Sequence, residues 1–176
     1  MNSEGTTSGP IQLWLVDDND QLRDTLANVL ASCGGLRCAK SFGSANAALS
    51  ALASRAGPDV ILLDINIGSE NGLDAVRPIR SLSRSTRVLM LTTFFDADAQ
   101  KRALEDGASG FLLKHYPLER IMESIRQARA TPEPAVQRRH PSCLKEKSVS
   151  STPARSSRWN GIRTPSWLGR LWNDWN

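Results

Sequence analysis

Residues 11–130 alternate short apolar runs with amphipathic runs, and this alternation limits the possible folds more than any other feature of the sequence. The apolar runs are typical of buried strands, and they cover residues 11–16, 36–42, 59–64, 87–91 and 110–114. Helical patterns follow them at about 20–32, 45–55, 72–82, 96–106 and 117–129. Strands that alternate with helices favour a parallel sheet, because each parallel connection needs a crossover.

The expected fold class is α/β. The length of the alternating region suits a doubly wound (βα)5 domain of the flavodoxin-like kind, with a parallel sheet in the order 2-1-3-4-5. The stretches ILL at 61–63 and VLML at 88–91 are continuously apolar, as strands buried on both faces should be. Ligands of such folds bind at the carboxyl ends of the strands, so candidate functional residues are expected there.

Polar side chains stand at the ends of four of the five expected strands. Asp17 and Asp18 follow the first strand, Asp64 ends the third, Thr92 follows the fourth and Lys114 ends the fifth. Each alone has an ordinary interpretation: a turn-forming or capping Asp, a strand-forming Thr, a Lys that reaches solvent. On adjacent strands they instead predict three carboxylates, a hydroxyl and an ammonium that converge on one shallow pocket.

The residue types in this pocket favour one chemistry. Three carboxylates repel one another until a cation neutralises them, and Mg²⁺ prefers carboxylate, water and phosphate oxygens. A carboxylate can attack phosphorus to give an aspartyl phosphate. An ammonium and a hydroxyl suit the charge that develops on phosphoryl oxygens. The pattern therefore predicts magnesium-dependent phosphoryl transfer.

Four segments, in order along the chain, resemble the receiver domain of bacterial response regulators, in the variety that carries a LuxR/NarL-type output module. They are DD at 17–18, VILLDINIGSENGLDA at 60–75, VLMLTTF at 88–94 and GASGFLLK at 107–114. The resemblance covers residues 11–130 and implies the flavodoxin-like receiver fold. By this resemblance the protein is a two-component response regulator in phosphorelay signal transduction.

The resemblance also implies a role for each site residue. Asp64 is the phosphoacceptor, Thr92 is the switch hydroxyl, Lys114 pairs with the phosphate and Phe111 is the rotating aromatic switch residue. The implied ligands of Mg²⁺ are Asp17, Asp18, Asp64 and the backbone carbonyl of Asn66. The implied partner is a sensor histidine kinase, and a homodimer is a further expected partner state. The chain would act as a phospho-accepting switch rather than an enzyme, with self-catalysed phosphotransfer and dephosphorylation left open.

Two positions depart from the family pattern. Gly68 stands where the family often has proline, which suggests a more flexible loop after Asp64 but removes no ligand. His115 follows Lys114, and an exposed loop residue is a simpler interpretation of it than a phosphorelay histidine.

A change of composition near Thr131 marks the end of the expected domain. Residues 1–130 carry 14 basic and 15 acidic side chains, whereas residues 131–176 carry 8 and 3. The second region also holds four of the five tryptophans and is rich in Pro, Ser and Arg. We expect a disordered N-terminus at 1–10, a receiver domain at 11–130, and a basic tail at 131–176 that is either disordered or a disrupted output module.

Several alternatives remain open from the sequence. A DNA-binding transcriptional regulator acting through the C-terminal region is one, although no recognition helix is visible and no specific DNA binding is expected from the tail. Residues 165–176 have an apolar stripe that could dock on a membrane or a partner. A flavodoxin-type electron carrier lacks the expected phosphate-binding loop. Three cysteines without metal-ligand spacing and a start without a secretory pattern predict a cytoplasmic protein.

Overall fold

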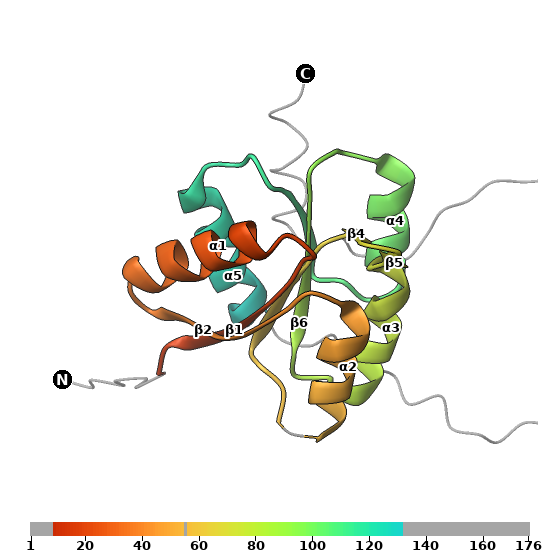
Figure 1. Cartoon of the computed structure of the whole chain (residues 1–176), viewed down its shortest axis with the longest axis horizontal. Helices are drawn as coiled ribbons and strands as arrows, with labels where there is room; N and C mark the ends of the chain where they lie inside the picture. Colours follow the sequence, from red (N-terminus) through yellow and green to blue (C-terminus); the bar gives the residue numbers. More distant parts are fainter. Residues whose placement is uncertain (1–8, 55, 132–176) are drawn as a thin grey trace, which may run out of the picture. The chain divides into compact units, whose positions relative to one another are not determined.

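The computed structural model describes residues 9–54 and 56–131 as five strand–helix units and a short additional hairpin (Figure 1). In chain order the elements are β1 (Ile11–Val16), α1 (Asp20–Ser32), β2 (Leu36–Phe42), α2 (Ala45–Ser54), β3 (Val60–Leu63), β4 (Asn66–Ile67), β5 (Glu70–Asn71), α3 (Leu73–Leu82), β6 (Arg87–Thr92), α4 (Ala97–Glu105), β7 (Gly110–Leu113) and α5 (Leu118–Ala130).

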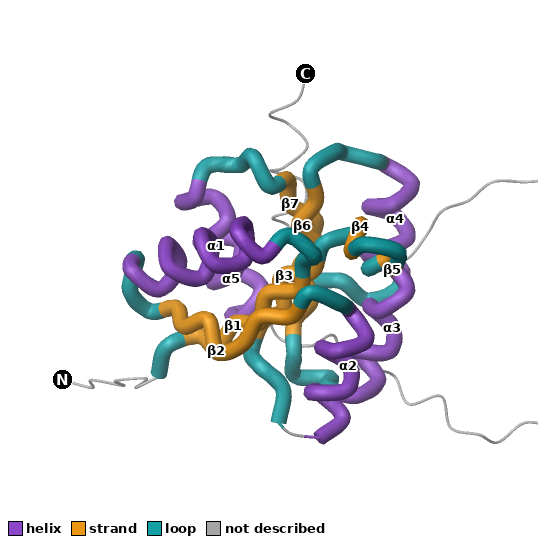
Figure 2. Tube along the Cα trace, viewed as in Figure 1, coloured by secondary structure: helices purple, strands orange, loops and turns teal. Residues whose placement is uncertain are grey.

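The five longer strands form one parallel sheet in the order β2-β1-β3-β6-β7 (Figure 2). Because β4 and β5 belong to the hairpin, this is the order 2-1-3-4-5 that the alternating pattern predicts. The centre of the sheet is fully covered, since all four residues of β3 are buried, and the edge strand β7 is buried in the same way. The predicted fold class is confirmed.

Two apolar layers hold the helices to the sheet. Helices α2, α3 and α4 cover one face, and α1 and α5 cover the other (Figure 1). Alternate residues of the central strands point into opposite layers: in β1, Trp14 and Val16 belong to the first layer and Leu13 and Leu15 to the second. This two-sided burial explains why the central strands are apolar without interruption.

The β4–β5 hairpin is the one element of the described region that the sequence does not predict. Its two strands pair Asn66 with Asn71 and Ile67 with Glu70 in antiparallel register. Strands of two residues are too short to show a hydrophobic period, so the segment had the appearance of a loop. The hairpin lies between Asp64 and α3 and therefore adjoins the carboxyl edge of the sheet.

Predictions about residues 1–8 and 132–176, including the domain limits beyond the sheet, the basic tail and the stripe at 165–176, lie outside the described residues. Within the described part, no helix has the length and apolar character that crossing a membrane requires.

Candidate functional site

The register of the sheet brings the first and third strand ends together. Val16 is paired with Leu63, so the residues that follow them, Asp17 and Asp64, lie side by side. The Asp64 backbone N–H donates to the Val16 carbonyl at 2.9 Å and extends this pairing by one bond. Strand pairing thus brings the backbones of the two aspartates together.

Three carboxylates form one cluster at this edge. One oxygen from each of Asp17, Asp18 and Asp64 lies within 4.8 Å of the other two. Asp17 and Asp64 are buried, with 4% and 5% of their surface exposed, whereas Asp18 is exposed. The predicted convergence of the adjacent acidic pair with Asp64 is present in the structure.

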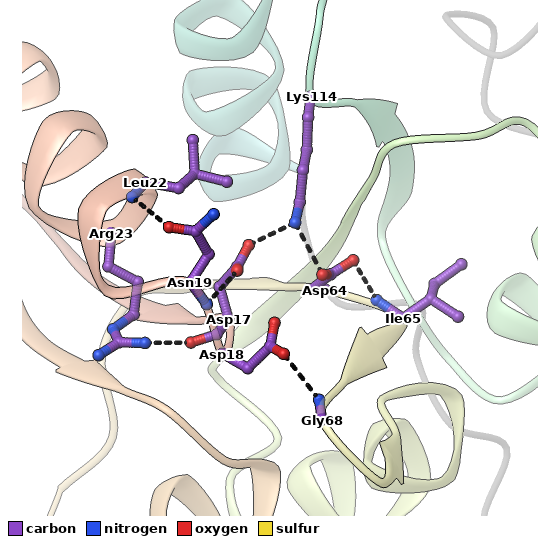
Figure 3. Close-up of polar contacts among 9 residues, drawn as sticks. All are labelled: Asp17, Asp18, Asn19, Leu22, Arg23, Asp64, Ile65, Gly68 and Lys114. Atoms are coloured by element: carbon purple, nitrogen blue, oxygen red, sulfur yellow. Dashed lines mark hydrogen bonds and ion pairs between the residues drawn. The ribbon is translucent and has the colours of Figure 1, made fainter.

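A backbone amide binds each of these carboxylates. The Asn19 N–H donates to Asp17 Oδ1 at 3.0 Å and the Ile65 N–H donates to Asp64 Oδ1 at 2.7 Å. Asp18 Oδ2 accepts from the Gly68 N–H at 3.1 Å (Figure 3). The first two donors are sequence neighbours of their acceptors, but the third comes from the hairpin.

Lys114 joins the two buried carboxylates. Its ammonium Nζ lies 2.6 Å from Asp17 Oδ2 and 2.7 Å from Asp64 Oδ2, and in Figure 3 the side chain extends down between them. The lysine follows β7, and its backbone N–H donates to the Thr92 carbonyl at 2.7 Å. A single cation therefore neutralises part of the charge of two buried anions.

These contacts shift the pKa values of both partners. Burial raises the pKa of Asp64, the hydrogen bond and charge of Lys114 oppose this, and the charge of Asp17 adds to the rise. For Lys114, burial acts to lower the pKa, but hydrogen bonds to Asp17 and Asp64 and their charges outweigh it, so the pKa is raised overall. The pocket therefore favours the charged form of the Lys114 ammonium and disfavours the ionised form of the Asp64 carboxyl.

The cluster has the chemistry of a site for a hard cation. It offers three carboxylates but a single ammonium in contact with them among the described residues. Asp17 Oδ2 is buried, and its one contact within the described part of the chain is the ion pair with the Lys114 ammonium, which leaves a lone pair for a further ligand. Oxygen-rich clusters with unused lone pairs suit Mg²⁺ or Ca²⁺. The residues present therefore fit a divalent cation.

The remaining predicted residues lie near the cluster without contacting it. Thr92 is buried at the end of β6, next to β3, and its hydroxyl makes no hydrogen bond to the cluster within the described residues. Asn66 begins β4 and is exposed. Phe111 of β7 is already buried in the layer beneath α2, α3 and α4, where its ring meets the edge of Phe95 at 6.3 Å between centroids. The functional roles of these three residues stay predictions.

The structure adds supporting residues that the sequence did not single out. Arg23 of α1, with only 12% of its side chain exposed, donates to the Asp17 carbonyl and pairs with Asp20. Gly72 lies so close to Asp64 that a Cβ there would be 1.9 Å from the Asp64 carbonyl oxygen. Arg23 resembled any helix arginine, and Gly72 resembled any turn glycine, so neither carried a recognisable signal.

Known proteins resemble the part of the chain that forms the sheet and its helices. The family model for the response regulator receiver domain matches residues 13–126. The transcriptional regulatory protein LnrK of Bacillus subtilis is 35% identical over 115 residues, which are 65% of this chain and 52% of LnrK. This chain thus spans about half the length of that relative.

Solved structures show the same likeness. The signal receiver domain of NarL from Mycobacterium tuberculosis superimposes with a TM-score of 0.64 at 26% identity, over 69% of this chain and 97% of that one. A response regulator from Burkholderia pseudomallei, solved with a phosphorylated aspartic acid, a calcium ion and citrate, gives a TM-score of 0.60 at 25% identity, over 65% and 66% of the two chains.

Proposed function

Because this chain belongs to the response regulator receiver domain family, we propose that it accepts a phosphoryl group on Asp64 from a sensor histidine kinase. Receiver domains are the phosphorylated components of two-component signalling systems. The observation that supports Asp64 as the acceptor is its place in the cluster: it is a buried carboxylate bound to Lys114 and adjacent to Asp17 and Asp18.

The transfer needs a nucleophile and positive charge, and the site has both. An Asp64 carboxylate oxygen forms a bond to phosphorus while the bond between phosphorus and the donor histidine nitrogen breaks, and that nitrogen keeps the electron pair. Lys114 uses two of its three ammonium N–H groups on Asp17 and Asp64, so the third can reach a phosphoryl oxygen. Its raised pKa keeps it protonated throughout.

Asp17, Asp18, Asp64 and the backbone carbonyl of Asn66 would hold a magnesium ion at the same edge. When bound, the ion supplies positive charge to the phosphoryl oxygens. The protein's own contribution is to fix its carboxylates beforehand, through the amides of Asn19, Ile65 and Gly68. Preorganised dipoles of this kind lower the cost of reorganisation during the reaction.

The phosphoryl group carries a charge of about −1.5 to −2, and it replaces the single negative charge of the Asp64 carboxylate. Thr92 stands at the adjacent strand end and has the hydroxyl that can donate to it. Phe111 lies on the next strand and contacts Phe95 in the segment between β6 and α4. We propose that the signal passes along this route to the surface of the β6–α4 and β7–α5 units.

Phosphorylation by a small donor tests the proposal. The full chain incubated with labelled acetyl phosphate and Mg²⁺ should acquire label, and EDTA should abolish it. Asp64→Ala should reduce labelling to background, whereas Asp24→Asn, which removes an exposed carboxylate on α1, should leave it unchanged. Undiminished labelling of Asp64→Ala would exclude Asp64 as the acceptor.

LnrK is a transcriptional regulatory protein, and the likeness to it supports a second candidate function. In this alternative the C-terminal region binds DNA and phosphorylation of the receiver domain controls that binding. The sequence of residues 131–176 argues against it, because its basic residues are not accompanied by the regular aliphatic spacing of a folded helical module. The two proposals differ in whether this chain recognises a DNA sequence.

A further inference from the structure

Asp18 differs from the other two carboxylates in what holds it. Asp17 and Asp64 are buried, contact Lys114, and accept from amides one or two residues away in the chain. Asp18 is exposed, and its one hydrogen bond within the described residues comes from Gly68, fifty residues away in the chain. A single long-range contact therefore determines where this carboxylate lies.

The donor of that bond belongs to the β4–β5 hairpin, which several contacts hold in place. The Gly72 N–H donates to the Ile65 carbonyl at 2.7 Å and closes the base of the hairpin, and Ile67 is buried in the core with 2% exposure. Gly68 itself has a φ of 59°, a conformation that glycine adopts without strain and proline cannot reach. The expectation that Gly68 makes this loop more flexible stays a prediction.

A second contact fixes the far side of the hairpin. Glu70 Oε2 accepts from the Ala45 N–H at 2.6 Å and from the Asn46 N–H at 3.3 Å, and Oε1 accepts from Asn46 Nδ2 at 2.7 Å. Glu70 thus caps the first turn of α2 with a charge that suits the positive end of the helix. The hairpin is held between α2 and the segment that carries Asp18.

We infer that the Gly68 amide is a positioning group that orients Asp18 for Mg²⁺ and favours Mg²⁺ over Ca²⁺ at this site. The inference rests on the proposed function, since it concerns the same cation. The amide binds Asp18 Oδ2 and leaves the Oδ1 atom for a ligand role. Mg²⁺ demands near-ideal octahedral geometry, whereas Ca²⁺ accepts variable numbers and directions of oxygens. Fixing an exposed carboxylate in advance therefore benefits Mg²⁺ more.

Two matched substitutions at Gly68 test the role of its amide. Gly68→Pro removes the N–H and cannot adopt the positive φ. Gly68→Asn keeps the N–H, and Asn tolerates positive φ better than most residues. A side chain has room there, because nothing lies within 4 Å of a Cβ built on Gly68. The asparagine variant is therefore the control that changes the residue but retains the contact.

Calorimetric titration of the metal-free full chain with MgCl₂ and with CaCl₂ gives the readout. Gly68→Pro should weaken Mg²⁺ binding by about tenfold, the order found when outer partners of metal ligands are removed. Ca²⁺ binding should weaken by a smaller factor, so the selectivity for Mg²⁺ falls. Gly68→Asn should leave the affinities for Mg²⁺ and Ca²⁺ close to those of the unaltered chain. Glu70→Ala, which frees the hairpin without altering Gly68, should lower the selectivity in the same direction.

The outcomes distinguish a failure of the proposed function from a failure of the role of Gly68. If the unaltered chain binds no Mg²⁺, the proposed function fails. If it binds Mg²⁺ but Gly68→Pro and Glu70→Ala leave the selectivity unchanged, or weaken both cations equally, only the role of Gly68 is overturned. If Gly68→Pro fails to fold, Glu70→Ala decides. Melting curves in EDTA show which variants keep the fold.

Discussion

At the scale of single residues, the charges of Lys114 and Asp64 affect the stability of the folded protein. The pocket holds two buried carboxylates and one ammonium, so the charges are not fully compensated in the metal-free protein. The raised pKa of Asp64 expresses this, because burial and Asp17 disfavour its ionised form more than Lys114 favours it. A site that is arranged to bind a cation therefore has excess negative charge, and lower stability, when the cation is absent.

Removal of Lys114 should expose this balance. Lys114→Met leaves Asp17 and Asp64 buried without their cation, and we expect it to lower the free energy of unfolding by about 3 kcal/mol at neutral pH. Chemical denaturation in EDTA measures the loss. Millimolar Mg²⁺ should recover much of it, because the cation binds the folded state. Lys114→Arg, which keeps the charge, should lose less; equal losses in both variants would contradict this account.

The raised pKa of Asp64 predicts a pH dependence with a definite sign. The folded protein holds the proton to a higher pH than the unfolded chain, whose Asp has a pKa near 3.8, so stability falls as pH rises through the folded pKa. Asp64→Asn cannot ionise and escapes this loss. In EDTA, its stability relative to the unaltered chain should therefore increase between acid and neutral pH. A relative stability that decreases over this range would show that the environment favours the ionised carboxylate.

At the scale of elements, the sequence predicted the long strands and helices well because their patterns are long. The runs that end at Val16 and Leu63 gave the strands, and parallel pairing then placed Asp17 and Asp64 together. The hairpin escaped prediction, since two-residue strands have no period. The cap of α2 by Glu70 also escaped, because it joins residues about 25 positions apart. Contacts that depend on tertiary placement leave no local pattern in the sequence.

The junction of the hairpin and α3 leads to a prediction at Gly72. The backbone there approaches Asp64 so closely that an alanine Cβ would overlap the Asp64 carbonyl oxygen. Gly72→Ala must displace either α3 or the strand end, which typically costs about 1–3 kcal/mol. It should also reduce phosphorylation of Asp64. Gly9→Ala, where a Cβ meets open space, should change neither the melting temperature nor the labelling. A Gly72→Ala protein as stable and active as the unaltered chain would contradict the close approach.

For the whole molecule, the proposed function ends at the surface of the β6–α4 and β7–α5 units, and the sequence after α5 bears on whether this chain also binds DNA. The change of charge and composition predicts a domain boundary near Thr131, and this boundary stays a prediction. Residues 131–176 add a net positive charge without a pattern of helix-forming aliphatic residues. The prediction of no specific DNA binding follows from that composition.

Binding of the phosphorylated full chain to DNA of varied sequence, over a salt series, tests this prediction. Arginines that meet phosphates give weak binding that is insensitive to sequence and declines steeply as salt rises. We expect this behaviour or no binding. Tight binding that selects one sequence at physiological salt would instead support the transcriptional alternative.

The central claim is that Asp64 becomes an aspartyl phosphate, and chemical trapping tests it most directly. Borohydride reduces an acyl phosphate to an alcohol, so it converts a phosphorylated aspartate into homoserine. After reaction of the full chain with acetyl phosphate and Mg²⁺, peptide mass spectrometry should find homoserine at position 64 and unmodified aspartate at positions 17 and 18. Homoserine at either of those positions, or at none of the three in a protein that has acquired label, would contradict the assignment.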